Sequence, residues 1–114
     1  MQVYLLPRLD PYEHLAMEEC LLAQHSGDSS LLLYRNRPTV VVGSFQNIHA
    51  ETRAAWLEGK NILLARRISG GGCVYHDEGN ICWAFLLPCH QPELLHLGDH
   101  LEPLLQGLAR LGVA

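Results

Sequence analysis

Short apolar runs alternate with polar and glycine-rich turns along most of the chain, a pattern typical of a protein that mixes strands with helices. The runs that we interpret as strands are residues 2–6, 31–34, 39–42, 61–65, 73–75 and 81–87. The longest apolar stretch, Ile81 to Pro88, has the length of a strand and falls well short of the ~20 residues that span a bilayer. With 114 residues, the chain is expected to form one small globular domain with no membrane partner.

A helix is expected between the first two strands, from about Asp10 to Gln24. Asp10 can cap this helix, Pro11 suits its first position, and Glu13 completes a capping-box pattern. The side chains expected on its inner face are Tyr12, Leu15, Ala16, Leu22 and Ala23, and those expected towards solvent are Glu13, Glu18 and Gln24. Glu18 and its neighbour Glu19 diverge by about a hundred degrees on a helix, so we interpret them as solvated rather than as a catalytic pair.

The runs at 31–34 and 39–42 predict a hairpin, because only the turn from Arg35 to Pro38 separates them. Such a hairpin would bring residues 43–47 to one edge of the sheet.

Two further helices are expected in the second half of the chain. The first would be capped by Asn47, run through Leu57 and end at Gly59. The second would extend from Glu93 to Leu111, where leucines recur at core-like spacing, with a restart near Pro103 left open.

Eight basic and twelve acidic residues give a formal net charge of −4, which argues against a nucleic-acid-binding protein with a broad cationic surface. The four cysteines are Cys20, Cys73, Cys82 and Cys89. They show no close pairing and no secretory context, so we expect reduced thiols, with Cys20 and Cys82 packed as small hydrophobic side chains. The N-terminal residues carry no targeting pattern, which favours a cytoplasmic protein.

Two sets of residues could suggest a metal site or a catalytic nucleophile. Cys89, His90, His96 and His100 could suggest zinc, but they do not form a compact four-ligand set. Cys73 could act as a nucleophile, but no base is identifiable beside it. We therefore expect neither a metal ligand nor a catalytic cysteine.

The segment from Arg66 to Asn80 is the most constrained stretch, because it places two cations, three consecutive glycines and a tight polar turn between apolar segments. Glycines are retained where the backbone needs positive φ or where a group must approach the main chain closely. Successive amides of such a loop can form an anion-binding nest, and Arg66 and Arg67 would add donors suited to phosphate or carboxylate. This pattern indicates a cradle for a nucleotide or an acyl phosphate, and the alternative is a hairpin loop with two solvated arginines.

The string Arg-Arg-x-Ser-Gly-Gly-Gly-x-Val-Tyr-His-Asp-x-Gly-Asn, from Arg66 to Asn80, closely resembles the signature of lipoate-protein ligases. The resemblance extends to Leu33-Tyr34-Arg35-Asn36, Val41-Val42-Gly43, Gln46-Asn47, Asp10-Pro11, Leu15-Ala16 and Glu18-Glu19. It implies the α+β fold of the biotin and lipoate protein ligases, which is related to class II synthetases and has a mixed, mostly antiparallel sheet flanked by helices. The chain resembles the N-terminal part, about the first half, of the catalytic domain of the lipoate-protein ligase A family.

The resemblance implies ATP-dependent activation of lipoate to lipoyl-adenylate, with Mg²⁺, and transfer of the lipoyl group to a lysine. The implied acceptors are lipoyl domains of 2-oxoacid dehydrogenase E2 subunits or the glycine cleavage H protein. The residues implied in binding ATP and the acyl-adenylate are Arg66, Arg67, Ser69, Gly70, Gly71, Gly72, Cys73, Val74, Tyr75, His76, Asp77 and Asn80. Those expected to border the acyl pocket are Tyr34, Val42, Gly43 and Gln46.

The chain departs from the family pattern in two places. Many members carry an arginine where Ser44 stands. The family chain also continues into strands that supply a lysine contacting the activated acyl group, whereas the only lysine here, Lys60, lies upstream in another context. Residues 1–114 therefore look truncated before the catalytic lysine, and no catalytic residue is assigned. The alternatives are a non-catalytic fragment, a module that binds a ligand or partner, or an enzyme related to octanoyltransferases. Unpaired sheet edges would favour self-association or a complementing chain.

Overall fold

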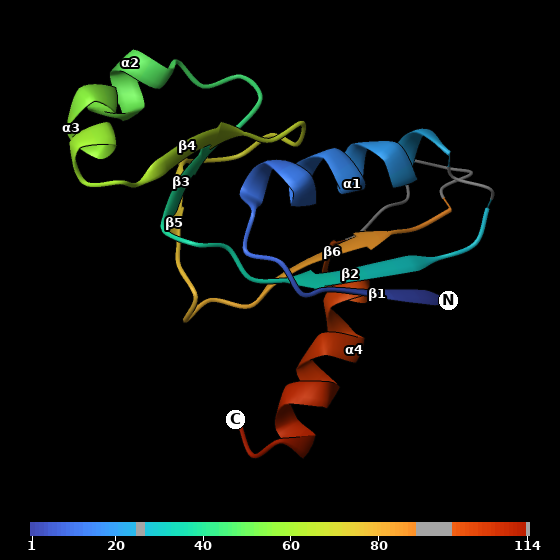
Figure 1. Ribbon diagram of the computed structural model, residues 1–114. Coiled ribbons are helices and arrows are strands. Elements are labelled where there is room, and N and C mark those ends of the chain that lie inside the picture. Colours follow the sequence, from blue (N-terminus) through green and yellow to red (C-terminus); the bar gives the residue numbers. More distant parts are fainter. Residues whose placement is uncertain (25–26, 89–96, 114) are drawn as a thin grey trace.

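A computed structural model describes residues 1–24, 27–88 and 97–113 of the chain (Figure 1). The elements in these residues are β1 (Gln2–Leu6), α1 (Pro11–Ala23), β2 (Ser30–Tyr34), β3 (Thr39–Val42), α2 (Ile48–Glu51), α3 (Ala54–Gly59), β4 (Leu63–Arg66), β5 (Val74–His76), β6 (Cys82–Leu86) and α4 (Leu97–Arg110). Each expected strand is present to within a few residues, and the α+β class is confirmed. None of the helices in the described ranges is long and apolar enough to cross a membrane.

The strands form two three-stranded sheets, with the orders β1-β2-β6 and β4-β3-β5. In each sheet the central strand is parallel to one neighbour and antiparallel to the other. The parallel neighbours are joined through helices, α1 in the first sheet and α2 with α3 in the second, as parallel pairing requires. The sheets are therefore mixed, with their pairings divided evenly between parallel and antiparallel.

The expected hairpin between β2 and β3 does not form. Both edges of β2 are occupied by β1 and β6, and both edges of β3 are occupied by β4 and β5. The link between them is instead an extended crossing between the sheets, in which Arg37 N donates to Leu9 O at 3.0 Å. Asn36 in this link is almost fully buried. The turn-like sequence therefore connects two sheets rather than two neighbouring strands.

Helix α1 begins as expected, since the Asp10 side chain accepts hydrogen bonds from the amides of Tyr12 and Glu13. Its inner face was predicted only in part. Leu15 is half-buried and Glu13 and Gln24 are exposed, as expected, but Ala16 and Ala23 are exposed. Pro11 and His14 are buried and Glu18 is half-buried, whereas Tyr12 and Leu22 are exposed. Polar side chains can occupy the inner face because β2 and the link after it supply hydrogen-bond partners for them.

Smaller corrections concern the second half of the chain and one cysteine. The helix expected over residues 47–59 is split into α2 and α3, because Thr52 is extended with φ −138° and ψ 158°. Cys20 is exposed rather than packed. Cys89, His90 and His96 of the zinc alternative, and the start of the final helix at 93–96, lie outside the described residues.

Helix α1 covers one face of the first sheet, and α4 starts on the other side and extends away from it (Figure 1). Val3, Leu5 and Trp83 therefore remain exposed. Leu32, Tyr34 and Leu86 form the buried cluster on the α1 side, packed against Met17 and Leu21 of that helix. The second sheet stands beside α1, so a space bounded by both sheets and α1 remains for a site.

Candidate functional site

The loop from β4 to β5 passes over the end of β3, which lies between those strands. Ser44 N donates to Ser69 O at 3.0 Å and fastens the loop to the chain that leaves β3. A Cβ on Gly43 would overlap the carbonyl oxygen of Gly71, so this crossing requires glycine at position 43. Gly71 itself has φ +99°, a left-handed conformation that side chains disfavour. Two glycines of the resembling motif are therefore explained by the path of the loop.

The Arg67 side chain binds main-chain carbonyls of the glycine loop and of β3. Its Nη2 donates to the carbonyls of Gly70 and Gly72 at 2.8 Å each, and its Nη1 donates to Val41 O at 3.4 Å. The guanidinium thus ties three carbonyls of two segments together and brings a positive charge to the inside of the loop.

Arg66 points elsewhere and supports the turn after β3. Its Nη1 donates to the carbonyls of Gly43 at 2.9 Å and Gln46 at 2.8 Å. Gln46 in turn accepts from Gly43 N at 2.8 Å through its Oε1. Both arginines therefore donate to main-chain carbonyls, and only Arg67 also borders the adjoining cavity.

The amides of Gly70, Gly71 and Gly72 have no hydrogen-bond acceptor among the described residues. The carbonyls of Ser69, Gly70 and Gly72, by contrast, accept hydrogen bonds from Ser44 N and the Arg67 side chain. A loop with its carbonyls bound and its successive amides free is suited to hold an anion. This arrangement fits a phosphate group.

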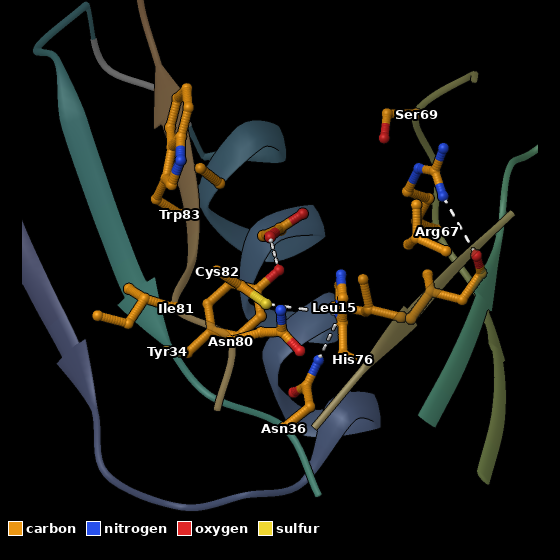
Figure 2. Close-up of a pocket in the computed structure, with 14 residues that line it drawn as sticks. Leu15, Tyr34, Asn36, Arg67, Ser69, His76, Asn80, Ile81, Cys82 and Trp83 are labelled. Atoms are coloured by element: carbon orange, nitrogen blue, oxygen red, sulfur yellow. Dashed lines mark hydrogen bonds between the residues drawn. The ribbon is translucent and has the colours of Figure 1, made fainter. Parts of the chain in front are cut away.

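A cavity of about 360 Å³ lies between the two sheets beneath α1 (Figure 2). Its lining residues are Leu15, Glu18, Tyr34, Asn36, Val41, Arg67, Ser69, Val74, His76, Asn80, Ile81, Cys82, Trp83 and Ala84. One part of this lining is apolar, and the other carries hydrogen-bonding and charged groups. A cavity of this size and mixed lining suits a small ligand with an apolar chain and a polar head.

Glu18 and Tyr34 form a pair in the cavity wall, in which the Tyr34 hydroxyl donates to Glu18 Oε1 at 2.7 Å. Burial raises the pKa of Glu18, although the Tyr34 hydrogen bond and the electrostatic interactions with His14 and Arg67 oppose the rise. Burial and the Glu18 bond also raise the pKa of Tyr34, so its hydroxyl remains a donor. The pair therefore consists of a neutral hydroxyl donor and a carboxyl group whose ionisation is disfavoured by burial.

We expect Glu18→Gln to make the protein more stable at neutral pH. The folded-state pKa of Glu18 lies above its ordinary value of 4.5, so the stabilisation linked to its bound proton is complete below that value and is lost as the pH rises through the raised pKa. The gain should stay below about 1 kcal/mol, because the carboxyl is partly open to solvent.

Urea unfolding near pH 4 and near pH 7.5 measures this effect, with the exposed neighbour Glu19→Gln as the control. A difference between Glu18→Gln and wild type that is the same at both pH values would contradict the expectation.

A second polar group joins α1, the link after β2, and strands β5 and β6. Asn36 lies between His14 Nδ1 at 2.7 Å and His76 Nδ1 at 3.2 Å, and Cys82 Sγ lies 3.5 Å from the same nitrogen of His76. Burial, followed by the charge of Arg67, lowers the pKa of His76. Burial, followed by the charge of Glu18, raises the pKa of Cys82 to about 11. Near neutral pH His76 is therefore a neutral imidazole and Cys82 a thiol.

The structure places most of the expected site residues in three groups. Those that line the cavity are Tyr34, Arg67, Ser69, Val74, His76 and Asn80. Those that form or support the loop above it are Arg66, Gly70, Gly71, Gly72, Gly43 and Gln46. Those that border a second hollow of about 420 Å³, beside Trp56, are Cys73, Val74 and Tyr75.

Two of the expected site residues lie elsewhere. Val42 is fully buried and borders none of the described cavities. Asp77 belongs to the turn before β6, where it accepts from Gly79 N at 2.9 Å.

Eight lining residues are absent from the expected site residues, namely Leu15, Glu18, Asn36, Val41, Ile81, Cys82, Trp83 and Ala84. Leu15, Glu18, Asn36 and Val41 belong to the segments that resemble the ligase family, and that resemblance was the signal available for them. The residues of β6 gave no signal, because their pattern indicates only a buried strand.

A family model described as the lipoyl protein ligase A/B catalytic domain matches residues 10–114. Lipoate-protein ligase 1 of Staphylococcus aureus is 40% identical over 105 residues, which are 91% of this chain and 32% of that protein. Lipoate-protein ligase LplJ of Bacillus subtilis is 36% identical over 105 residues, with the same two shares. The chain thus spans about a third of the length of these relatives.

Solved structures agree with the sequence relatives. LipL1 of P. falciparum in complex with lipoate has a TM-score of 0.72 and 30% identity, covering 75% of this chain and 30% of that one. A bi-partite lipoate protein ligase from Thermoplasma acidophilum, studied with its E2 lipoyl domain, has a TM-score of 0.77 and 25% identity, covering 89% and 40%. Lipoate-protein ligase A bound with ATP has a TM-score of 0.76 and 25% identity, covering 89% and 41%. The match of the family model over residues 10–114, with these relatives, shows that the chain belongs to the lipoyl protein ligase A/B catalytic domain family.

Proposed function

We propose that this chain is the part of a lipoate-protein ligase that binds ATP and the acyl-adenylate. The observation that carries the proposal is the glycine loop. Its amides at Gly70, Gly71 and Gly72 have no acceptor among the described residues, and the adjoining Arg67 and Ser69 line a cavity with an apolar part and a polar part. Residues 1–114 would then be the N-terminal part of the catalytic domain. The proposed reaction would consume ATP. We also propose that the protein acts in the cytoplasm.

The proposed reaction has two steps. An oxygen of the lipoate carboxylate attacks the α-phosphorus of ATP, and the bond to pyrophosphate breaks. The amine of a lysine on the acceptor protein then attacks the acyl carbon, loses a proton and releases AMP. Both steps depend on positioning and on neutralising charge. The loop amides and Arg67 would hold the α-phosphate, and Leu15, Val41 and Val74 would contact the acyl chain.

Magnesium would be held mainly by phosphate oxygens and water. Among the described lining residues Glu18 is the one carboxylate, and its raised pKa weakens it as a ligand. Mg²⁺ in nucleotide sites commonly relies on one or two carboxylates together with the phosphates. The ion supplies neutralisation of the charge that develops on pyrophosphate, and Arg67 adds to this neutralisation.

The described lining includes no lysine. Lys60 caps α3 and places its Nζ 5.9 Å from the centre of the Trp56 ring, beside the second hollow. We therefore propose that further polypeptide supplies the catalytic lysine. The bi-partite ligase of Thermoplasma acidophilum offers a precedent for a complementing chain. The acceptors would be lipoyl domains of E2 subunits or the glycine cleavage H protein.

Calorimetry with a non-hydrolysable lipoyl-adenylate analogue tests the binding part of the proposal. We expect saturable binding by the isolated chain, and an absence of binding would overturn it. Mass spectrometry of a lipoyl domain incubated with lipoate, ATP, Mg²⁺ and this chain tests the lysine. We expect acylation only when the rest of a ligase catalytic domain is added, and acylation by the chain alone would contradict the need for that segment.

A further inference from the structure

The side-chain amide of Asn36 bridges two imidazole rings. Asn36 is 2% exposed and His14 is fully buried, so water does not compete for these bonds. Asn36 Oδ1 lies 2.7 Å from His14 Nδ1, and its Nδ2 lies 3.2 Å from His76 Nδ1. An amide accepts at its oxygen and donates at its nitrogen. The two Nδ1 atoms must therefore be in opposite states, one carrying a proton and the other not.

Cys82 is the third group that contacts the imidazole of His76 at this junction. Its Sγ lies 3.5 Å from His76 Nδ1, and with a pKa of about 11 it is a thiol at neutral pH and can donate S–H. A thiol is both a weak donor and a weak acceptor, so this contact agrees with an unprotonated Nδ1 on His76 but does not by itself assign the ring proton.

His14 distinguishes the two arrangements. When its Nδ1 donates to Asn36 Oδ1, the Nε2 of a neutral ring carries no proton. This Nε2 atom is buried and has no hydrogen-bond partner in the described part of the chain. Buried acceptors without a partner are less rare in proteins than buried N–H groups without one. The unpartnered Nε2 of His14 therefore favours a proton on Nδ1 of His14, which leaves Nδ1 of His76 as the acceptor from Asn36 and places the ring proton of His76 on Nε2.

The free edge of His76 faces the cavity. His76 lines the cavity together with Arg67 and Ser69. Figure 2 shows its ring held by Asn36 and Cys82 on one side, with the rest of the ring turned towards the space on the side of Arg67 and Ser69. An N–H in that direction would meet the polar head of a bound ligand.

We propose that Asn36 and Cys82 are positioning residues that hold His76 in its Nε2–H tautomer, so that His76 donates a hydrogen bond to a carboxylate or acyl oxygen of the ligand in the cavity. The identity of this ligand rests on the proposed function, whereas the tautomer does not. The site would favour a carboxylic acid or its acyl-adenylate over an analogue without an oxygen acceptor at that position.

Nitrogen-15 spectra of the histidine side chains test the tautomer directly in the ligand-free chain. We expect His76 at neutral pH to carry its proton on Nε2 and His14 to carry it on Nδ1. A proton on Nδ1 of His76 would overturn the proposal. Cys82→Val combined with Asn36→Leu should let His76 populate both tautomers, whereas Cys82→Ser should keep the Nε2–H form because a hydroxyl can still donate.

Calorimetry with the lipoyl-adenylate analogue tests the donor role. We expect His76→Phe to weaken binding about tenfold or more, since a charged or polar acceptor loses its donor, and His76→Gln to recover part of the loss through its side-chain N–H. Unchanged affinity in His76→Phe, with the wild type binding well, would overturn the donor role and leave the proposed function intact. If the wild type binds no analogue, the proposed function fails, and the spectra still decide the tautomer.

Discussion

Replacing Gly43 with alanine is expected to displace the glycine loop and to lower affinity for the lipoyl-adenylate analogue at least tenfold. The new Cβ would overlap the carbonyl oxygen of Gly71, which is a backbone atom and cannot rotate away. Overpacking of this kind commonly costs about 1–3 kcal/mol of stability. Here the strain would fall on the segment that carries the free amides, so binding should suffer together with folding.

Urea unfolding and calorimetry measure the two effects of Gly43→Ala. The matched control is Gly59→Ala at the end of α3, where an added Cβ meets nothing within 4 Å. That variant should stay within about 0.5 kcal/mol of wild type and should bind as the wild type does. A Gly43→Ala protein with unchanged affinity would show that the loop does not hold the ligand.

Replacing Arg67 with alanine is expected to weaken ATP binding by at least tenfold, or about 1.4 kcal/mol. The substitution removes the hydrogen bonds to the carbonyls of Val41, Gly70 and Gly72. It also removes the positive charge that borders the cavity. Without the guanidinium the loop carbonyls lose their donors, and the amides on the other side lose their orientation.

The control is Arg53→Ala, which removes an arginine that borders only the second hollow. Calorimetry with ATP should show a markedly smaller loss for Arg53→Ala than for Arg67→Ala. Equal losses would remove the phosphate role of Arg67. Arg67→Lys is informative as well, because an ammonium keeps the charge but cannot reproduce the planar fork of donors. A charge-only role would let this variant bind ATP normally.

The strands and the capped start of α1 could be predicted because they depend on local chemistry. Asp10 accepts from Tyr12 N and Glu13 N within one turn, so the sequence contains both partners. The glycine loop could be predicted for a similar reason, since three glycines after two arginines already limit what the backbone can do. The specific order of residues from Arg66 to Asn80 then pointed to the family that the comparisons support.

The pairing of strands could not be predicted in the same way. A short polar turn between β2 and β3 is compatible with a hairpin, and the alternative depends on β1 and β6, which lie far away in sequence. Once both edges of β2 are occupied, β3 has no position beside it. Competition for strand edges is a property of the whole chain, and a local pattern does not report it.

The inner face of α1 illustrates the same limit for side chains. A carboxylate and an imidazole on a helix are normally solvent-facing, because burial of an unpaired polar group is costly. Glu18 and His14 can point inward because each has a hydrogen-bond partner there. Tyr34 pairs with Glu18, and Asn36 pairs with His14. The cavity wall is built from these pairs, so the sequence interpretation missed part of the site.

The sequence alone determined the class of fold, the position of the glycine loop and the family, because each depends on neighbouring residues or on a contiguous motif. Only the tertiary structure decided that Arg67 binds the loop carbonyls, that Gly43 must lack a side chain, and that Asn36 meets His14 and His76. The physical reason is that hydrogen bonds and steric contacts act over a few ångströms in space, and the chain brings these partners together from segments 20 to 40 residues apart.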